Sequence, residues 1–202
     1  LNFTFYNGKK YAISNENLYD YKMLYGQIYR NYLARNLQEM GYDLNITDRE
    51  KGFFELAGVD QEVIDKFSSR RQEIVKKLEE MDDFSSKAAE IATLKTRKAK
   101  EHKNFKILLD SWKSDLNEFG FKLERGEKEE FIKSNFAPLF ERAKMNISRQ
   151  TFAFTDKEFY KEALKCSLGS GATIGDAENY LDQQLKDKRI YFLGDLDDKK
   201  YF

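Results

Sequence analysis

Basic side chains, gathered in two short segments, are the residues of this chain whose types and spacing best fit a defined chemistry. Residues 85–106 hold seven basic residues and two acidic ones. Ser68, Ser69, Arg70 and Arg71 form a second group of hydrogen-bond donors. Guanidinium, ammonium and hydroxyl groups on one surface bind phosphate oxygens, so both segments are candidates for contact with a nucleic-acid backbone. A solvated helix face explains the same composition equally well.

Patterns for catalysis are mostly missing. The single histidine, His102, excludes a three-histidine metal site built from this chain alone. No glycine-rich phosphate loop and no Gly-x-Ser-x-Gly sequence is present. Asp195, Asp197 and Asp198 lack the bidentate glutamate of a calcium loop and fit a solvated turn better. A tyrosine nucleophile needs a metal or a base to activate it, and none can be named. We therefore predict no catalytic residue, no metal ligand and no cofactor.

Composition indicates a globular protein. Hydrophobic residues make up 41% and charged residues 35% of the chain, and no apolar run reaches the length of a membrane span. The 35 basic residues balance the 35 acidic ones, so only local charge can attract a nucleic acid. Cys166 cannot form an intramolecular disulfide, which fits the cytoplasm, and its apolar neighbours predict a buried, inert thiol. Because the first residue is Leu1, we expect an excised or processed part of a longer protein.

The first sixty residues show the patterns of two hairpins separated by a helix. Asn7-Gly8 tolerates the positive φ of a tight turn and lies between two aromatic runs. Apolar residues then recur at helical spacing up to Gly41, which is a plausible stop. In order, we expect a hairpin over residues 3–13, a helix over 18–40 and a hairpin over 42–56.

From Asp60 the pattern becomes helical. We expect one helix from Asp60 to Leu78, a second from Ser85 to His102 and a third from Phe105 to Phe119. Within the second helix, Thr96, Arg97 and Lys100 would share one face. A charged stretch over residues 124–130 is the best candidate for a domain boundary, and a helix over 127–148 follows, kinked at Pro138.

The last fifty residues alternate between strand and helix signals. We expect a short strand over 152–154, a helix capped by Thr155 with Glu158, a second helix over 174–188 and a closing β-hairpin. This order is winged-helix-like. The fold class is therefore α+β and mainly helical, with short hairpins, a helical extension and a C-terminal winged-helix-like module. The predicted domains are residues 1–123, a linking helix over 124–150, and 151–202.

Five ordered blocks of the sequence carry a resemblance to a known family: residues 28–33, 37–43, 54–59, 67–74 and 94–100. They resemble the second half of the relaxase domain of MobF-type conjugative relaxase–helicases, the TraI/TrwC family. Trp112 and Gly120-Phe121 continue the match, and the segment from Phe152 to Gly194 resembles the start of the helicase-like region that follows.

The resemblance implies a non-catalytic part of such a relaxase. In the family, a tyrosine attacks a DNA phosphodiester beside a metal held by three histidines, and both elements would precede Leu1, while the ATPase motifs would follow Phe202. The implied role is to bind single-stranded DNA of the transfer origin and to link nicking and helicase domains. The implied partners are single-stranded DNA, the N-terminal relaxase segment, the C-terminal helicase region and type IV secretion components, with no membrane. Whether this chain alone is an enzyme stays open.

The resemblance also nominates residues for holding DNA. Lys22, Gly26 and Arg30 lie on one face of the first helix, where Gly26 would permit close approach of DNA or serve a simple packing contact. Trp112 could stack a base, but its helical position predicts burial. The nominated DNA-binding residues are Lys22, Arg30, Arg70, Arg71, Lys95, Arg97, Lys98 and Lys100.

Two other functions compete with this prediction. One is a protein-interaction or secretion-signal docking module without direct DNA binding. The other is a winged-helix regulator, which is disfavoured because the expected recognition helix over 174–188 carries Asp176, Glu178, Asp182 and Asp187. Strands before residue 60 would normally join a larger sheet, and alone they predict self-association or a missing N-terminal partner.

Overall fold

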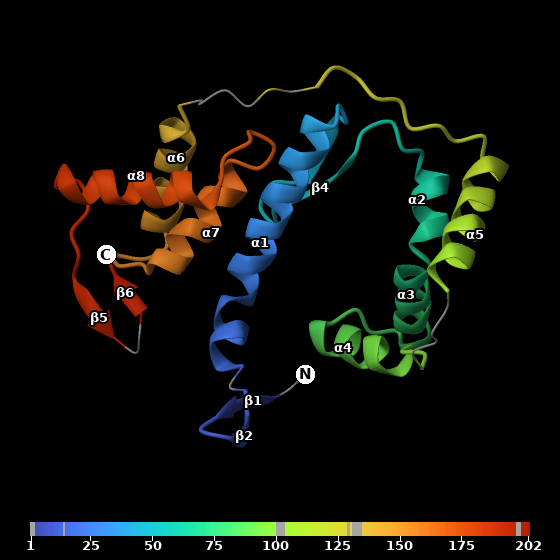
Figure 1. The fold of residues 1–202 in the computed structure, drawn as a ribbon, viewed down its shortest axis with the longest axis horizontal. Helices are drawn as coiled ribbons and strands as arrows, with labels where there is room; N and C mark the ends of the chain where they lie inside the picture. The colour runs from blue at the N-terminus through green and yellow to red at the C-terminus, as the bar shows by residue number, and fades with distance from the viewer. Residues whose placement is uncertain (1–2, 14, 100–103, 129, 131–134, 197–198) are drawn as a thin grey trace. The chain divides into compact units, whose positions relative to one another are not determined.

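The structure, a computed structural model, describes residues 3–13, 15–99, 104–128, 130, 135–196 and 199–202. Contacts divide the chain into two compact units (Figure 1). Unit 1 joins Leu1–Ala57 to Arg125–Phe202, and unit 2 is Gly58–Glu124. Helices dominate both units and the strands occur in antiparallel pairs, so the expected α+β, mainly helical class is confirmed. The division into domains at residues 123 and 150 stays a prediction.

The N-terminal part of unit 1 has the elements that its sequence predicts. β1 (Phe3–Tyr6) pairs with β2 (Lys9–Ala12) around Asn7 and Gly8, whose φ angles are 48° and 73°. α1 (Glu16–Glu39) ends where Gly41 adopts a φ of 87° and Tyr42 donates its N–H to the Leu37 carbonyl. β3 (Leu44–Asp48) then pairs with β4 (Phe53–Leu56). Both predicted hairpins and the helix between them are confirmed.

A buried polar chain joins α1 to α7 (Asp156–Cys166). Gln27 donates to Asn31 at 2.9 Å, and Asn31 donates to the Leu164 carbonyl at 3.0 Å. Further along α1, Gln38 donates to the Gly169 carbonyl at 3.0 Å. The β3–β4 turn also lies against α1, because a Cβ built on Gly52 would stand 2.3 Å from the Gln27 side-chain oxygen. Hydrogen-bonded buried amides of this kind fix one packing register between helices.

The C-terminal part of unit 1 is a three-helix bundle. α6 (Ala137–Ser148) and α8 (Ile174–Lys186) both pack on α7, and β5 (Gly194–Leu196) pairs with β6 (Lys199–Tyr201). The predicted capping box between Thr155 and Glu158 is present. The buried core is aromatic and aliphatic: Phe140, Ala143, Phe154, Phe159, Ala163, Ala172, Ala177, Leu181, Ile190 and Phe202.

Three expectations for this bundle are wrong in extent. The helix expected from residue 127 begins only at Ala137, and Pro138 stands in its first turn, where its missing N–H costs nothing, instead of kinking the helix. Residues 152–154 form no strand, although Phe154 and Phe202 exchange two backbone hydrogen bonds. The closing hairpin was expected to pair residues 189–193 with 199–202, but its first strand is Gly194–Leu196. A winged-helix-like module stays a prediction.

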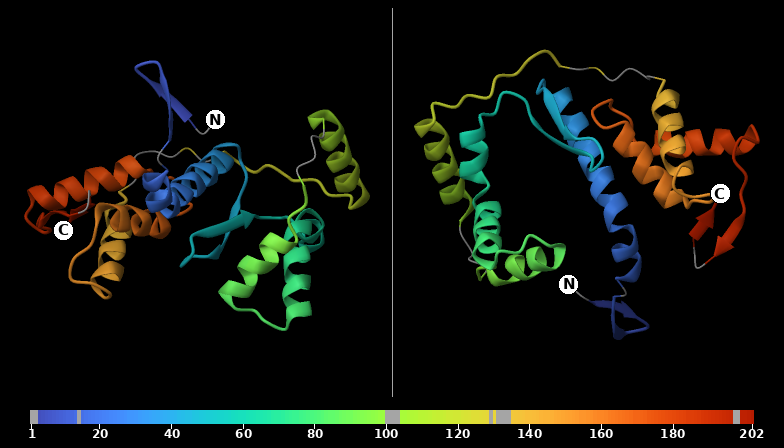
Figure 2. Two further views of the ribbon diagram at one scale, coloured as in Figure 1. Left: turned by 90° about the horizontal axis from the view of Figure 1, so that it is seen from below. Right: turned by 180° about the vertical axis from the view of Figure 1, so that it is seen from behind.

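Unit 2 is helical throughout its regular elements. It contains α2 (Gln61–Phe67), α3 (Ser69–Met81), α4 (Ser86–Lys95) and α5 (Phe105–Glu118). The single helix expected from Asp60 is therefore broken at Ser68, and the helix expected to reach His102 ends at Lys95. α3 and α4 lie side by side (Figure 2), and a small core of Leu78, Ala88 and Ala92 joins them.

Candidate nucleic-acid interface

Arg70, in the first turn of α3, binds the C-terminal end of α4. Its guanidinium donates to the Thr93 carbonyl at 2.6 Å and to the Thr96 carbonyl. The last carbonyls of a helix have no partner within the helix, and a cation placed there also opposes the negative end of the helix dipole. Arg70 therefore fixes α4 against α3 across 23 and 26 residues of sequence.

Basic side chains surround this contact. Two cavities of about 400 Å³ each open beside it and share Glu73, Arg97 and Lys98. We call the residues around them the α3–α4 basic surface. Its charged members are six basic residues and two carboxylates: Arg70, Lys76, Lys77, Lys95, Arg97, Lys98, Glu73 and Glu80. The balance of charge on this surface is positive.

Part of that positive charge is neutralised within the surface. Glu73 pairs with Lys98 and, at 3.7 Å, with Arg70. The hydrogen bond from Lys98 is the main cause that lowers the pKa of the Glu73 carboxyl below its usual value. Lys77 pairs with Glu80. Within the described ranges, three cations of this surface make no ion pair and are exposed: Lys76, Lys95 and Arg97. These three cations are the ones most open to an external anion.

The structure thus gathers four of the nominated residues: Arg70, Lys95, Arg97 and Lys98. Arg71 is exposed but lines neither cavity. Lys100 and His102 lie outside the described residues. The expected helix face of Thr96, Arg97 and Lys100 is wrong, because α4 ends at Lys95 and Thr96 is its C-cap residue. Arg97 lies near the other cations through the packing of α4 on α3.

Lys22 and Arg30 lie on α1, in unit 1. Lys22 is exposed, whereas Arg30 is half-buried, donates to the Gln27 side-chain oxygen at 2.8 Å and stands 5.2 Å from the Phe53 ring centroid. Burial lowers the pKa of the Arg30 guanidinium, and its Nε has no hydrogen-bond partner among the described residues. A Cβ on Gly26 would meet only the Arg30 guanidinium, at 3.6 Å, so no packing contact in the described part of the chain requires this glycine.

Several aromatic side chains are more exposed than their spacing predicts. Trp112 is 42% exposed, so the expectation that it is buried is wrong. Four tyrosines of α1 are exposed as well: Tyr19, Tyr25, Tyr29 and Tyr32. An amphipathic spacing shows which residues share a face, but it does not show that a partner covers that face.

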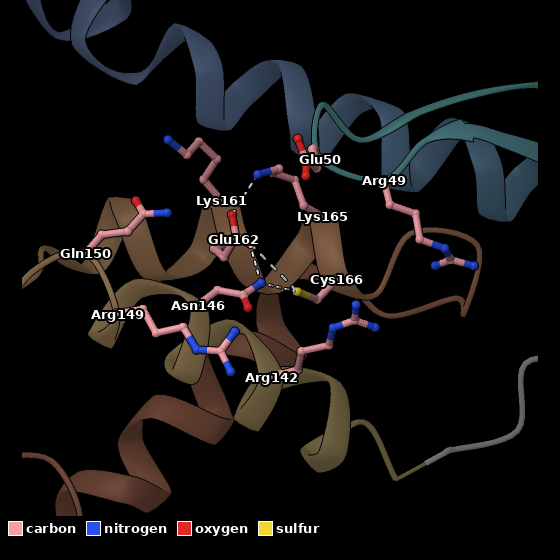
Figure 3. Close-up of a pocket in the computed structure, with 10 residues that line it drawn as sticks. All are labelled: Arg49, Glu50, Arg142, Asn146, Arg149, Gln150, Lys161, Glu162, Lys165 and Cys166. Carbon is pink, nitrogen blue, oxygen red and sulfur yellow. Dashed lines mark hydrogen bonds and ion pairs between the residues drawn. The ribbon is translucent and has the colours of Figure 1, made fainter.

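Sequence reasoning missed a cavity of unit 1 that has a volume of about 620 Å³ (Figure 3). We call it the α6–α7 cavity. Its lining residues come from α6, α7 and the β3–β4 turn: Arg49, Glu50, Arg142, Asn146, Arg149, Gln150, Lys161, Glu162, Lys165 and Cys166. The sequence holds one signal of it, because Arg142, Asn146 and Arg149 recur at helical spacing. That Lys161 and Lys165 face the same space follows only from packing.

The described residues hold neither a cluster of metal ligands nor a helix that could span a membrane. No group of three or more His, Cys, Asp and Glu side chains in the described ranges is arranged to hold a metal ion. No helix in the part of the chain that the structure describes is long and apolar enough to cross a membrane.

The sequence of the chain is similar to those of known proteins. A family model described as TrwC relaxase matches residues 1–119. The chain is 33% identical over 106 residues to the multifunctional conjugation protein TraI of Escherichia coli strain K12, and 32% identical over 107 residues to a second Escherichia coli TraI. The first match covers 52% of this chain and 6% of the relative, and the second covers 53% and 6%. No solved structure matches the chain.

Proposed function

The chain belongs to the TrwC relaxase family, and we propose that within such a relaxase it helps to hold single-stranded DNA without carrying the cleavage chemistry. The α3–α4 basic surface is the observation that carries the proposal, and it lies within the matched residues 1–119. A surface with more cations than carboxylates gains affinity for phosphates by releasing condensed counterions from the strand. Lys76, Lys95 and Arg97 would make the first such contacts, because no carboxylate in the described part of the chain pairs with them, and the last two lie together at the end of α4.

The C-terminal bundle, from α6 to β6, lies beyond the matched residues. We assign it the linking role between nicking and helicase domains of the parent protein. The order of α7, α8, β5 and β6 supports a winged-helix-like module there. The same proposal includes the N-terminal relaxase segment, the helicase region and secretion components as partners, and a cytoplasmic location.

One observation favours the competing function, a protein-interaction module. α1 exposes a set of large apolar side chains, and the β1–β2 hairpin beside it in sequence is almost wholly exposed. Contiguous exposed apolar surface marks sites where another protein segment packs. The exposed members on α1 are Leu18, Tyr19, Met23, Tyr25, Tyr29 and Tyr32. A segment of the parent protein that covers them is compatible with DNA holding by unit 2.

Titration of a fluorescently labelled single strand at several salt concentrations tests the DNA proposal. The variant Lys95→Ala/Arg97→Ala should bind about tenfold or more weakly at low salt, since hydrogen bonds to charged groups contribute about 1.5–3 kcal/mol each. Its slope of log affinity against log salt should fall by about 1.4, which is two phosphate contacts on a single strand. Arg70 is left in place because its loss would also disturb α4.

The matched control is Lys186→Ala/Lys200→Ala, which removes two exposed positive charges from unit 1. It should bind like the wild type at each salt concentration. Absence of binding by the wild type at low salt, or equal weakening by the two double variants, would contradict DNA holding by the α3–α4 basic surface.

A further inference from the structure

The α6–α7 cavity combines a polar floor with a basic rim. In Figure 3, Asn146, Glu162 and Cys166 lie together at its centre, and the five basic side chains surround them. Asn146 donates to Glu162 at 2.9 Å, and Lys165 pairs with the same carboxylate at 2.7 Å. These two contacts offset the negative charge of Glu162 within the cavity wall.

Glu162 stays ionised in this wall, and Lys165 balances its negative charge. Burial raises the pKa of its carboxyl, but the hydrogen bonds from Lys165 and Asn146 outweigh burial and lower the pKa overall. Cys166 adds no charge, because burial raises the pKa of its thiol. The net charge that faces the cavity is therefore decided by the remaining rim residues.

Those rim residues are strongly basic. Arg49, Arg142, Arg149 and Lys161 make no ion pair with any residue that the structure describes, and Glu50 is the one other carboxylate among the lining residues. Three of these cations carry guanidinium groups, which present paired donors that match phosphate oxygens. Four unpaired cations around a polar hollow repel one another until an anion fills it, so the chemistry of the cavity fits an anion with several oxygens.

The volume and the surroundings indicate an extended anion. About 620 Å³ lies within the range of sites for whole organic ligands and far exceeds the volume of one inorganic phosphate. Phe152 follows Gln150, a lining residue, by two positions, and its side chain is fully exposed at 109%. A fully exposed aromatic ring two positions along the chain from the lining of a basic cavity is a candidate platform on which an unpaired base stacks.

We propose that the α6–α7 cavity binds phosphodiester groups of a single-stranded nucleic acid, with Phe152 stacking on one of its bases. This would be a second strand-binding site, on unit 1, held by residues beyond the TrwC-matched 1–119 apart from Arg49 and Glu50. The proposal rests on the proposed function only in its ligand class, because its residues are separate from the α3–α4 basic surface.

The test uses the full 202-residue chain and a labelled oligothymidylate, titrated over a range of salt concentrations. Arg142→Ala/Arg149→Ala should weaken binding about tenfold or more, and should reduce the salt slope by about 1.4. Phe152→Ala should weaken binding roughly fivefold or more while leaving the salt slope unchanged, because stacking releases no counterions. Thermal melts followed by circular dichroism verify that each variant is folded, and Lys186→Ala/Lys200→Ala serves as the charge control.

The outcomes separate this site from the one on unit 2. Weakening by Arg142→Ala/Arg149→Ala but not by Lys95→Ala/Arg97→Ala supports the cavity and overturns the α3–α4 basic surface. The reverse result overturns the cavity and leaves the proposed function standing. Binding of ATP or inorganic phosphate as tightly as the oligonucleotide, lost in the same cavity variant, would overturn a nucleic-acid strand as the ligand. A slope reduced by Phe152→Ala as much as by the arginine variant would overturn the stacking role.

Discussion

At the scale of single residues, Arg70 has two candidate roles, phosphate binding and helix capping. Its place in a Ser-Ser-Arg-Arg group predicts a phosphate ligand, whereas the structure uses its donors on the Thr93 and Thr96 carbonyls. The side chain of the neighbouring Arg71 is exposed and makes no hydrogen bond or ion pair with a described residue. The two arginines therefore form a natural pair of test and control.

We predict that Arg70→Ala lowers the free energy of unfolding of unit 2 by about 1 kcal/mol, the usual net value of hydrogen bonds to helix-terminal carbonyls at an exposed site. Urea unfolding followed by circular dichroism measures this change. Arg71→Ala should leave the stability within about 0.5 kcal/mol of the wild type. Equal stability of the two variants would remove the capping role from Arg70.

At the scale of elements, the start of α7 depends on an ionised carboxylate. Glu158 accepts hydrogen bonds from the Thr155 N–H at 2.8 Å and from its hydroxyl at 2.9 Å. Burial raises the pKa of Glu158, but these hydrogen bonds outweigh burial, and the pKa is lowered overall from 4.5. A carboxyl whose folded pKa lies below its unfolded pKa contributes stability above the unfolded value, and that contribution is lost as the pH falls through the folded value. Glu141 and Glu162 have lowered pKa values in the same bundle.

We therefore expect the C-terminal bundle to lose stability as the pH falls below about 4.5. Glu158→Gln should make this loss smaller, because a neutral amide can still accept from Thr155 but no longer titrates. Thr155→Ala should cost about 1 kcal/mol at neutral pH, the usual loss for an N-cap. Thermal melts between pH 7 and pH 3 give the comparison, with the exposed Glu178→Gln of α8 as control. An unchanged acid response in Glu158→Gln would show that the capping box does not contribute to it.

At the scale of the whole molecule, exposed apolar surface has a consequence for assembly. The hairpin β1–β2 and one side of α1 are exposed, and unpaired strand edges together with apolar patches favour association. Tyr29 on α1 and Tyr191 before β5 have nearly equal exposed fractions, 66% and 65%. This pair separates an effect of the α1 surface from a general effect of removing a tyrosine.

We predict that the isolated chain self-associates as its concentration rises, and that Tyr29→Ser weakens this association more than Tyr191→Ser does. Size-exclusion chromatography with light scattering measures the mass at each concentration. A single species of 23.9 kDa at all concentrations would contradict the prediction. Addition of a relaxase segment that covers α1 should replace the self-associated species by a one-to-one complex of the chain with that segment.

The sequence by itself determined the features that depend on a few neighbouring residues. The turn at Asn7-Gly8, the end of α1 at Gly41 and the capping box at Thr155 follow from local φ preferences and from hydrogen bonds that span three or four residues. The family resemblance was likewise visible in ordered blocks, and the match to residues 1–119 confirms it. The helix expected over the basic run after Ser85 was overestimated in length, because it ends at Lys95.

Only the tertiary structure decided where the charges meet. α4 ends at Lys95 where its last carbonyls meet Arg70 from another helix, a contact that no local pattern encodes. Arg49 reaches the same cavity as Arg142 although 93 positions separate them, because the β3–β4 turn lies beside α6 and α7. Such meetings depend on the packing of whole elements, and the free energy of packing comes from distant residues together. The spacing of residues within one segment therefore determines which side chains share a face, whereas the tertiary structure determines which residues of other segments contact that face.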